Sequence, residues 1–259
     1  MKTDPVELMN LAARIARAAG DIVIRGRRSG RLDSSTKSTA TDMVTKWDGL
    51  SEHMIVDAIR SARPGDGIVG EEGTEIASSS GISWLIDPID GTTNFMYGLS
   101  GYAVSIAATD ESGAIAGVVF LPTTRELFVA ARGHGSWLGE RRLECTTQSD
   151  PSTALVGTGF SYSSTLRQRQ GARIARLLPN VRDIRRLGAA APDLCFMADG
   201  RLDAYFEENL SPWDMAAGLL VATEAGAIAS DFTGGPPRPA EILVSAPGLH
   251  SHLIAFLTP

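Results

Sequence analysis

The sequence predicts a mixed α+β and α/β protein in which layers of helices and sheets pack together. Residues 102–138 consist of short apolar runs separated by turn sequences, which is typical of an antiparallel meander. Beyond residue 150, short apolar runs alternate with helical patterns, which is typical of an α/β arrangement. We therefore expect a single unit, 1–259, with a soft division near residue 150 into an α+β half, 1–150, and an α/β half, 151–259.

The first half begins with two predicted helices. Apolar residues from Val6 to Arg25 recur at helical spacing, and the following GRLDSSTKSTAT has the composition of a loop. A second helix is predicted to begin at Thr45, with Asp48 three residues later as in a capping box. Two strands then follow, because the next runs are short, β-branched and bounded by glycine or proline: GIVGEEG and SWLIDP.

The second half is predicted to alternate between strands and helices. The predicted strands are LVGTGF, RDIRRL, RLDAYFE, AIASDF and EILVSA. The predicted helices are residues 165–178, PDLCFMAD, PWDMAAGLLVATEAG and GLHSHLIAFL. The third of these helices has proline in its first turn and glycine near its end, where each residue is favoured.

Composition limits the class of protein and its partners. Hydrophobic residues make up 43% of the 259 residues, and the formal net charge is -6 without a block of like charges. Such a chain is expected to be globular and to have no nucleic acid as its partner. No signal-like N-terminus or long apolar run occurs, so no membrane association is expected. Cys145 and Cys195 form no CxxC pair, which is typical of reduced buried thiols in a cytoplasmic protein.

Acidic residues gather where predicted elements begin or end. These clusters are Asp42 with Asp48, Glu71 with Glu72, Asp87 with Asp90, and Asp214. Carboxylates brought together repel one another unless a cation compensates, and a divalent metal is the natural compensator. None of the four histidines lies in these clusters, and ligation by oxygen alone favours Mg²⁺, Mn²⁺ or Ca²⁺ over Zn²⁺. Mg²⁺ is the preferred interpretation, because it accepts few carboxylates completed by water and phosphate.

The segment DPIDGTTNF adds an anion site to these acids. If a helix begins at its glycine, Asp90 lies near the N-cap, and the N–H groups of Gly91 and Thr92 point outward at the positive end of the helix dipole. A phosphate would then bind directly beside the metal carboxylates. This combination predicts metal-assisted phosphoryl chemistry, and the lack of a GxxxxGK[ST] motif favours hydrolysis over nucleotide-driven transfer.

Three motifs in this order resemble those of a known family: GEEG, DPIDGTTNF and PWDMAAG. They are similar to the motifs of the inositol monophosphatase family, Mg²⁺-dependent, lithium-sensitive sugar and cyclitol phosphatases related to fructose-1,6-bisphosphatase. The resemblance extends from Lys37 to the TEAGA run at Thr223. It implies a layered αβαβα sandwich and a homodimer.

The resemblance also implies a set of metal ligands. Glu71, Asp87 and the main-chain carbonyl of Ile89 would bind a first metal, whereas Asp87, Asp90 and Asp214 would bind a second one, with Asp87 bridging. A weaker third metal would depend on Glu71. The implied cofactor is therefore two or three Mg²⁺ ions, with Mn²⁺ as a possible substitute.

Further roles follow from the same resemblance. Gly91 and Thr92 match the amides that bind phosphate, and the Thr92 hydroxyl with Asp48 matches the pair that orients or deprotonates the attacking water. The backbone of Gly188, Ala189 and Ala190 matches the segment that contacts substrate hydroxyls. Glu207, seven residues before Asp214, matches the acid that binds cyclitol hydroxyls.

Some residues also have purely structural interpretations. Asp87, Asp90 and Asp214 are at positions where aspartate often caps a helix, and Asp48 is explained by its capping box alone. Their combination in one motif set favours metal ligation for the first three. Ala189 replaces the threonine or serine that the family often has there, and Pro192 follows it, which affects specificity more than catalysis. Trp84, Trp213 and Phe95 are expected to be core aromatics, and Lys37 is a possible neighbour of the phosphate.

The sequence hypothesis is a phosphomonoesterase that hydrolyses a small polyol phosphate such as myo-inositol 1-phosphate, by in-line attack of a metal-activated water. A histidinol-phosphate phosphatase is an alternative, because a carboxylate at Glu207 suits an ammonium group as well as hydroxyls. Adenosine 3′,5′-bisphosphate and fructose 1,6-bisphosphate are further candidate substrates. A non-enzymatic alternative is a binding partner of the transcription machinery, as in some bacterial relatives.

Overall fold

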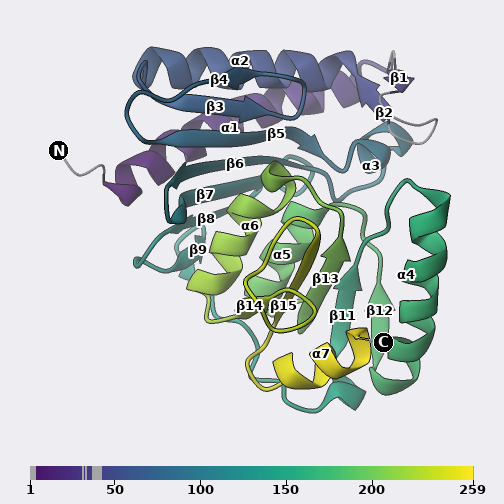
Figure 1. The fold of residues 1–259 in the computed structure, drawn as a ribbon. Coiled ribbons are helices and arrows are strands. Elements are labelled where there is room, and N and C mark those ends of the chain that lie inside the picture. The colour runs from purple at the N-terminus through teal and green to yellow at the C-terminus, as the bar shows by residue number, and fades with distance from the viewer. Residues whose placement is uncertain (1–3, 31, 33, 37–42, 259) are drawn as a thin grey trace.

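The computed structural model describes residues 4–30, 32, 34–36 and 43–258. Lys37 and Asp42 lie outside these residues. Figure 1 shows two sheets separated by helices and covered by helices on their outer faces. The helices are α1 (Pro5–Arg28), α2 (Lys46–Ala62), α3 (Thr92–Tyr97), α4 (Ser164–Leu177), α5 (Ala190–Ala198), α6 (Pro212–Glu224) and α7 (His250–Leu257), with 3-10 turns η1 (Pro151–Thr153) and η2 (Leu178–Asn180).

The larger sheet has the strand order β10-β9-β8-β7-β6-β5-β3-β4. Its strands are β3 (Gly67–Gly70), β4 (Glu75–Ile76), β5 (Ser83–Asp90), β6 (Ala103–Asp110), β7 (Gly113–Leu121), β8 (Glu126–Ala131), β9 (Ser136–Leu138) and β10 (Arg141–Arg142). β6 to β9 form the predicted meander and pair antiparallel. β5 extends this sheet by pairing antiparallel with β6, whereas β3 and β5 are parallel. The carboxyl ends of β3 and β5 therefore lie at the same edge of the sheet.

The smaller sheet has the strand order β12-β11-β13-β15-β14. Its strands are β11 (Leu155–Thr158), β12 (Asp183–Arg185), β13 (Ala204–Glu208), β14 (Ile228–Ser230) and β15 (Glu241–Ser245). β11 pairs parallel with both β12 and β13, and β15 pairs antiparallel with β13 and β14. The two sheets fall on either side of residue 150; the single unit with a division there stays a prediction.

Five layers follow from the packing of these elements. α1 and α2 cover one face of the larger sheet, and α6 contacts its other face. α5 packs on α6 and contacts the smaller sheet, and α7 packs on the far side of that sheet beside α4. The layered αβαβα sandwich that the sequence and its resemblance predict is therefore present.

Burial on both faces explains why the central strands are almost continuously apolar. Ile106 of β6 packs in the core beneath α1 and α2, whereas its neighbour Ala107 packs in the core beneath α5 and α6. Val118 and Val119 of β7 divide between the same two cores. Successive side chains point to opposite faces of a strand, so each of these pairs contributes to both cores.

Several sequence expectations are corrected in detail. The segment 30–41 is not simply a loop, because β1 (Ser34–Thr36) within it pairs antiparallel with β2 (Met43–Thr45). Cys145 is half-buried, whereas Cys195 is buried as expected, and both thiols are free. Searching the described residues for a helix with the length and hydropathy to cross a bilayer identifies no such helix.

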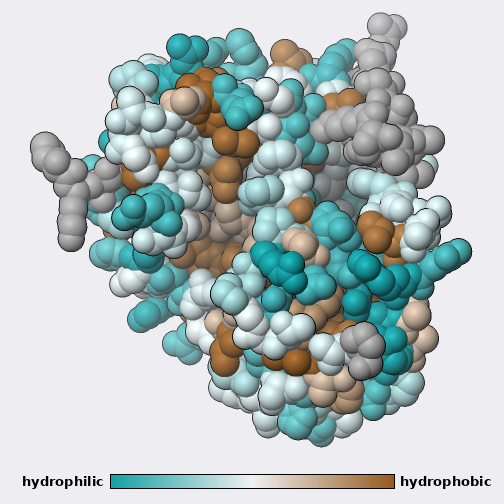
Figure 2. Space-filling model, in the orientation of Figure 1, coloured by the Kyte–Doolittle hydropathy of each residue, from teal (hydrophilic) through white to brown (hydrophobic). Residues whose placement is uncertain are grey.

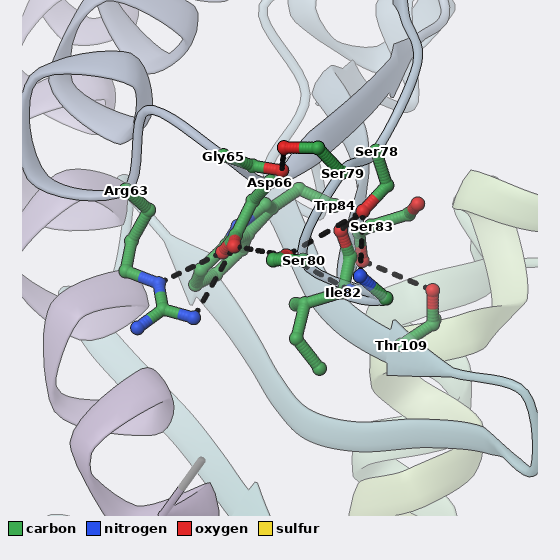
Figure 3. A network of polar contacts seen from close by, with 11 residues as sticks. Arg63, Gly65, Asp66, Ser78, Ser79, Ser80, Ile82, Ser83, Trp84 and Thr109 are labelled. Carbon is green, nitrogen blue, oxygen red and sulfur yellow. Dashed lines mark hydrogen bonds and ion pairs between the residues drawn. The ribbon is translucent and has the colours of Figure 1, made fainter. Parts of the chain in front are cut away.

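A hydrogen-bonded network closes the amino-terminal ends of β3 and β5 (Figure 3). The buried carboxylate of Asp66 accepts hydrogen bonds from Arg63 Nε at 2.9 Å, from Ser80 Oγ at 2.6 Å and from Trp84 Nε1 at 3.0 Å. Burial alone would raise the pKa of Asp66, but these donors outweigh it and lower the pKa. This acid is fully partnered by the protein itself.

Candidate active site

A cavity of about 510 Å³ lies where the carboxyl ends of strands from both sheets converge. It is lined by residues that follow β3, end β5, or follow β11, β12 and β13. Of the predicted site residues, the cavity lining contains Glu71, Asp87, Ile89, Asp90, Gly91, Thr92, Gly188, Ala189, Ala190, Glu207 and Asp214. The fold thus brings together segments that are more than 100 residues apart.

A bulge at the end of β5 directs its acids into the cavity. Asp87 pairs with Ser105 of β6, but the register shifts before Asp90 pairs with Ala103. Within the bulge, Ile89 N–H donates to Asp87 Oδ1 at 3.0 Å. Because a bulge interrupts the alternation of a strand, residues on both sides of it can face the same cavity.

Gly91 is the N-cap of α3, so Asp90 lies next to the N-cap, as the sequence predicts. Gly91 has φ 87°, a left-handed conformation that favours glycine. A Cβ at this position would lie 2.9 Å from Cβ of Ala189, so the turn packs directly on the segment before α5. A small residue at 189 is compatible with this contact.

Asp48 lies behind the cavity wall and is fully buried. Its Oδ2 accepts hydrogen bonds from the Thr45 N–H at 2.8 Å and the Thr45 hydroxyl at 2.6 Å, which confirms the predicted capping box of α2. Its Oδ1 lies 3.2 Å from Thr92 Oγ1, and the Thr92 hydroxyl is also 3.0 Å from the Ile89 carbonyl oxygen. The capping role and the contact with Thr92 therefore coexist.

The turn that carries Glu71 is held by a residue that the sequence did not single out. Glu52 of α2 is buried, and its carboxylate accepts hydrogen bonds from the N–H groups of Glu72 at 2.9 Å and Thr74 at 3.2 Å, and from the Thr74 hydroxyl. A Cβ on Gly70 would lie 2.4 Å from this carboxylate, so glycine leaves the space that Glu52 occupies. Glu52 and Asp48 are one helical turn apart, so one face of α2 supports two site segments.

Asp90 and Asp214 connect the two halves of the cavity. Asp90 Oδ2 accepts a hydrogen bond from the Ala191 N–H of α5 at 2.6 Å. Asp214 Oδ2 accepts one from the Ser211 N–H at 2.7 Å, within a capping box of α6. Pro192 lies in the first turn of α5, as predicted.

The acids of the cavity differ in pKa from carboxylates on an ordinary protein surface. Burial raises the pKa of Asp87 well above its usual value, and the negative charges of Glu71, Asp90 and Asp214 raise it further. Burial and the charge of Asp214 likewise raise the pKa of Asp90, against a lowering by the Ala191 N–H. The charged neighbours that dominate the pKa of Asp87 are thus other acids.

The donor set fits a hard divalent cation. Its side-chain ligands would all be carboxylate oxygens, and their mutual repulsion is what a bound cation would relieve. Within the described residues, no three His, Cys, Asp or Glu side chains are already at metal-ligand spacing. We explain this by the hydrogen bonds just described, which turn individual carboxylates toward N–H groups. The mutual repulsion of the carboxylates therefore says more about what the cluster binds than the orientations of the individual side chains do.

The opposite wall of the cavity carries a second group of acids. Glu207 on β13 is half-buried and accepts a hydrogen bond from the hydroxyl of Tyr205. Burial raises the pKa of Glu207 to about 7, despite the opposing effects of Tyr205 and Arg186. Asp193 of α5 is buried, and its Oδ1 has no hydrogen-bond partner. A Cβ on Gly159 would lie 2.1 Å from the Glu207 carboxylate, so the two residues are in close contact.

Sequence reasoning missed several of these residues and misplaced one. Tyr205 and Glu207 are two residues apart on a strand, so alternation could have placed them on one face. Glu52, Asp193 and Arg186 had no comparable signal, because the site residues that they lie near are mostly distant in the sequence. Trp213 is half-buried and lines the cavity, whereas the sequence favoured a core position.

The comparisons with known proteins agree with this site. Residues 4–257 match the model of the inositol monophosphatase family. An inositol-1-monophosphatase from Mycobacterium bovis is 41% identical over 98% of this chain and 94% of that protein, and a protein from Pasteurella multocida described as Nus factor SuhB is 42% identical over 88% and 86%. The structure of the extragenic suppressor protein suhB from Bartonella henselae superposes with a TM-score of 0.92 at 34% identity, covering 97% of this chain and 98% of that one.

These matches extend over nearly the whole chain, and the related structures share its layered architecture. The motifs that the sequence shares with the family are those that line the cavity. Residues 4–257 cover both sheets and every segment of the site. The chain therefore belongs to the inositol monophosphatase family and is a phosphoric monoester hydrolase.

Proposed function

We propose that this protein hydrolyses a small polyol phosphate, with myo-inositol 1-phosphate as the first candidate, and that it requires Mg²⁺. The observation that carries the proposal is the convergence of three groups in one cavity: the acids Glu71, Asp87, Asp90 and Asp214, the Gly91–Thr92 turn, and Glu207. A metal site, a phosphate site and a hydroxyl site are the three parts that this reaction needs.

Glu71, Asp87, the Ile89 carbonyl, Asp90 and Asp214 would hold two or three Mg²⁺ ions, for which Mn²⁺ could substitute. When bound, the metal neutralises the carboxylates, polarises the phosphoryl group and makes water a better nucleophile. The protein's own part begins at the start of α3, where the Gly91 and Thr92 amides would bind the phosphate at the positive end of a short helix.

Thr92 and Asp48 provide a path for the proton of the attacking water. Asp48 is fixed by two hydrogen bonds from Thr45, which leaves its Oδ1 to accept the hydrogen bond of Thr92 Oγ1. A hydroxyl that donates to a carboxylate has its lone pairs available for another donor. Thr92 Oγ1 would then accept a hydrogen bond from the water and orient it toward the phosphorus atom.

Glu207, with the backbone of Gly188, Ala189 and Ala190, would bind the rest of the substrate. A carboxylate accepts hydrogen bonds from hydroxyls, and Tyr205 holds this one in place. The same acid would suit the ammonium group of histidinol phosphate, which remains the first alternative substrate. The wall contains Ala189, whose methyl group supplies no hydrogen bond to a substrate.

Phosphate release from a panel of esters tests the proposal. The panel is inositol 1-phosphate, histidinol phosphate, fructose 1,6-bisphosphate and adenosine 3′,5′-bisphosphate, each with Mg²⁺, with Mn²⁺ and with EDTA. We expect metal-dependent turnover with the highest kcat/KM for inositol 1-phosphate. A higher kcat/KM for another ester would reassign the substrate, and no turnover of any ester with metal present would contradict the proposal.

We further propose a cytoplasmic homodimer. Three exposed apolar residues belong to segments beside the cavity: Tyr97 ends α3, Leu99 follows it, and Leu187 precedes the lining residue Gly188. Leu99 and Leu187 are linked through Asn94, whose backbone oxygen accepts from the Leu99 N–H and whose side chain donates to the Leu187 carbonyl. An exposed apolar group of this kind supports a protein interface. Light scattering after size exclusion should give twice the mass of the chain, and the mass of one chain would contradict the dimer.

A second proposed role is a contact with the transcription machinery. It is supported by relatives described as Nus factor SuhB, including the one from Pasteurella multocida at 42% identity. Catalytic and binding roles are separable, because an Asp87→Asn variant should lose hydrolysis and keep its surface. Co-purification of RNA polymerase subunits with this variant and with the parent protein would support the role, and recovery of none with either would contradict it.

A further inference from the structure

One buried acid of the cavity has no partner in the part of the chain that the structure describes. Asp193 of α5 lines the cavity, and only 1% of its surface is exposed. Among the described residues, no side chain or N–H group donates to its carboxylate, and its Oδ1 is enclosed. Burying a carboxylate without a hydrogen-bond donor is costly. The stability of the fold therefore does not explain why this position carries an acid.

A second buried acid of the same cavity shows how the protein supports an acid with a structural role. Glu208 ends β13 and is 3% exposed, and its carboxylate forms ion pairs with Arg169 at 2.9 Å and with Arg173. Both arginines belong to α4, and Figure 2 shows that much of the surface over this helix is hydrophilic. The fold thus supplies cationic donors to Glu208, whereas Asp193 receives no hydrogen bond from the described residues.

The charged groups that act on Asp193 belong to the cavity. Burial has the largest effect and raises the pKa of Asp193, Glu207 and Asp90 raise it further, and Arg186 lowers it. These three charged residues line the cavity themselves. The carboxyl group of Asp193 therefore lies on the cavity side of α5, within electrostatic reach of the acid that is proposed to bind substrate hydroxyls.

The first turn of α5 has few N–H groups left for an anion. The Ala191 N–H donates to Asp90 at 2.6 Å, and Pro192 has no N–H. The Asp193 N–H donates to the backbone carbonyl four residues earlier at 3.3 Å, which leaves the Ala190 N–H for a ligand. The start of a helix usually attracts anions. Here the carboxylates of Asp90 and Asp193 oppose that attraction, so this end of α5 suits a group that donates hydrogen bonds better than a phosphate.

We propose that the carboxyl group of Asp193 binds a hydrogen-bond donor on the alcohol part of the substrate. Asp193 and Glu207 then form a two-acid subsite for that part, and the donor is a hydroxyl or an ammonium group, because a carboxylate accepts hydrogen bonds from both. This inference rests on the proposed phosphatase function and assigns it a further substrate-binding residue. The contact is made in the ground state and in the transition state alike, so its loss raises KM more than it lowers kcat.

The test compares Asp193→Asn and Asp193→Leu with Glu208→Gln, which changes a partnered acid of the same cavity. We measure kcat and KM in saturating Mg²⁺ for inositol 1-phosphate, for histidinol phosphate and for p-nitrophenyl phosphate, whose alcohol part has no hydrogen-bond donor. Asp193→Leu should raise KM for inositol 1-phosphate about tenfold with kcat within about twofold, the effect of losing one hydrogen bond to a charged group. Asp193→Asn should raise it less, because the amide oxygen still accepts.

The pattern across the three esters identifies the donor. Removing a negative charge weakens the repulsion of every phosphate ester, so charge alone would lower KM for all three together. A rise in KM for the two natural esters, with p-nitrophenyl phosphate unaffected, supports the subsite. In Asp193→Asn, a larger rise for histidinol phosphate assigns the donor to the ammonium group, and a larger rise for inositol 1-phosphate assigns it to a hydroxyl. Unchanged KM for both natural esters, or equal changes for all three esters, would overturn the proposal.

Melting of the ligand-free protein separates binding from folding. Both Asp193 variants should melt at or above the temperature of the parent protein, because they remove a buried charge that has no partner. Glu208→Gln should melt at a lower temperature, because Arg169 and Arg173 lose the charge with which they pair. It should leave the ratio of KM between the esters unchanged. A lower melting temperature of Asp193→Asn would overturn the proposal, since the acid would then serve the fold.

The outcome is separable from the proposed function. If the parent protein hydrolyses no ester, the proposed function fails, but ligand-observed NMR still compares the binding of myo-inositol and of histidinol to the parent protein and to Asp193→Leu. Weaker binding of either alcohol to Asp193→Leu supports the subsite. Binding that is equal in the two proteins, or absent from both, would overturn it.

Discussion

The parallel strands β3 and β5 carry buried acids at both ends, and the two ends differ in how these acids are partnered. At the amino-terminal end, Asp66 is surrounded by donors from Arg63, Ser80 and Trp84, and its pKa is lowered (Figure 3). At the carboxyl end, the pKa of Asp87 is raised by burial and by other carboxylates, among them Glu71. The same sheet thus contains one acid whose charge is stabilised by donors and one whose charge is opposed by neighbouring acids.

This difference distinguishes an acid that stabilises the fold from an acid that binds a ligand. Removing Asp66 would leave buried donors without an acceptor, which is costly. Removing the charge of Asp87 would instead relieve repulsion in the metal-free protein. Unneutralised charge persists in a native fold mainly where function requires it, so the carboxyl end of the strand pair is the functional end.

The largest expected effect is the loss of hydrolysis in Asp87→Asn. This change removes the acid that is proposed to bridge two metals, and we expect kcat/KM to fall by about 10³-fold or more, as losses of central catalytic groups do. The melting temperature of the metal-free variant should equal or exceed that of the parent protein, because repulsion with Glu71, Asp90 and Asp214 decreases. Calorimetric melting in EDTA, combined with phosphate-release assays, measures both quantities. Retained hydrolysis would contradict the proposed role of Asp87 as a metal ligand. A clearly lower melting temperature would contradict the claim that removing its charge relieves repulsion in the metal-free protein.

Asp66→Asn should have the opposite pattern. The carboxylate accepts from Arg63 Nε and Trp84 Nε1 at Oδ2 and from Arg63 Nη2 and Ser80 Oγ at Oδ1. The amide has one acceptor oxygen, so one of these two pairs of donors loses its acceptor. We expect the free energy of unfolding to fall by about 2–4 kcal/mol, the range for breaking a buried charged network. Urea unfolding at pH 7 measures it, with kcat/KM unchanged in the folded variant. A loss below about 0.5 kcal/mol would show that the network is dispensable.

A smaller effect concerns a contact on the polyol side of the cavity. A Cβ in Gly159→Ala would lie 2.1 Å from the Glu207 carboxylate, so the carboxylate must move. It can move, because it is the end of a flexible side chain. We expect KM for inositol 1-phosphate to rise about tenfold, the loss of one hydrogen bond to a charged group, with p-nitrophenyl phosphate unaffected. Gly171→Ala in α4 is the control, because nothing lies within 4 Å of its Cβ. Equal increases in KM for both esters would show that Glu207 does not bind the substrate hydroxyls.

The smallest expected effect is the pH dependence of the Asp66 network. Because the pKa of Asp66 is lower in the folded protein than the ordinary value of 3.8 for this side chain, its charge contributes stability above the unfolded pKa. That contribution is lost as the pH falls through the folded pKa. The stability difference between the parent protein and Asp66→Asn should therefore be constant from pH 5 to 8 and shrink below about pH 4. Urea titrations across this range measure it, and a difference that grows with acidity would reverse the assigned direction.

Local patterns in the sequence determined much of this protein. Some features depend on residues within a few positions of one another, so they can be recognised without a structure. They include the helical segments, the capping box of Thr45 and Asp48, and the segment DPIDG. The motif set and the family resemblance also identified the family and five of the acids that line the cavity: Glu71, Asp87, Asp90, Glu207 and Asp214. Local reasoning also placed Asp90 near the N-cap of α3, but the bulge of β5 and the left-handed conformation of Gly91 are hard to recognise by pattern.

Only the tertiary structure decided how these acids are supported and balanced. Asp90 meets the N–H of Ala191 across 101 positions, Glu52 holds the turn of Glu71 from another helix, and Arg186 reaches a cavity formed mostly by other segments. Such contacts depend on strand order and on the packing of layers, which no short stretch of sequence encodes. The physical reason is that local propensity acts over a few residues, whereas burial and charge are shared among segments that meet only in the folded chain.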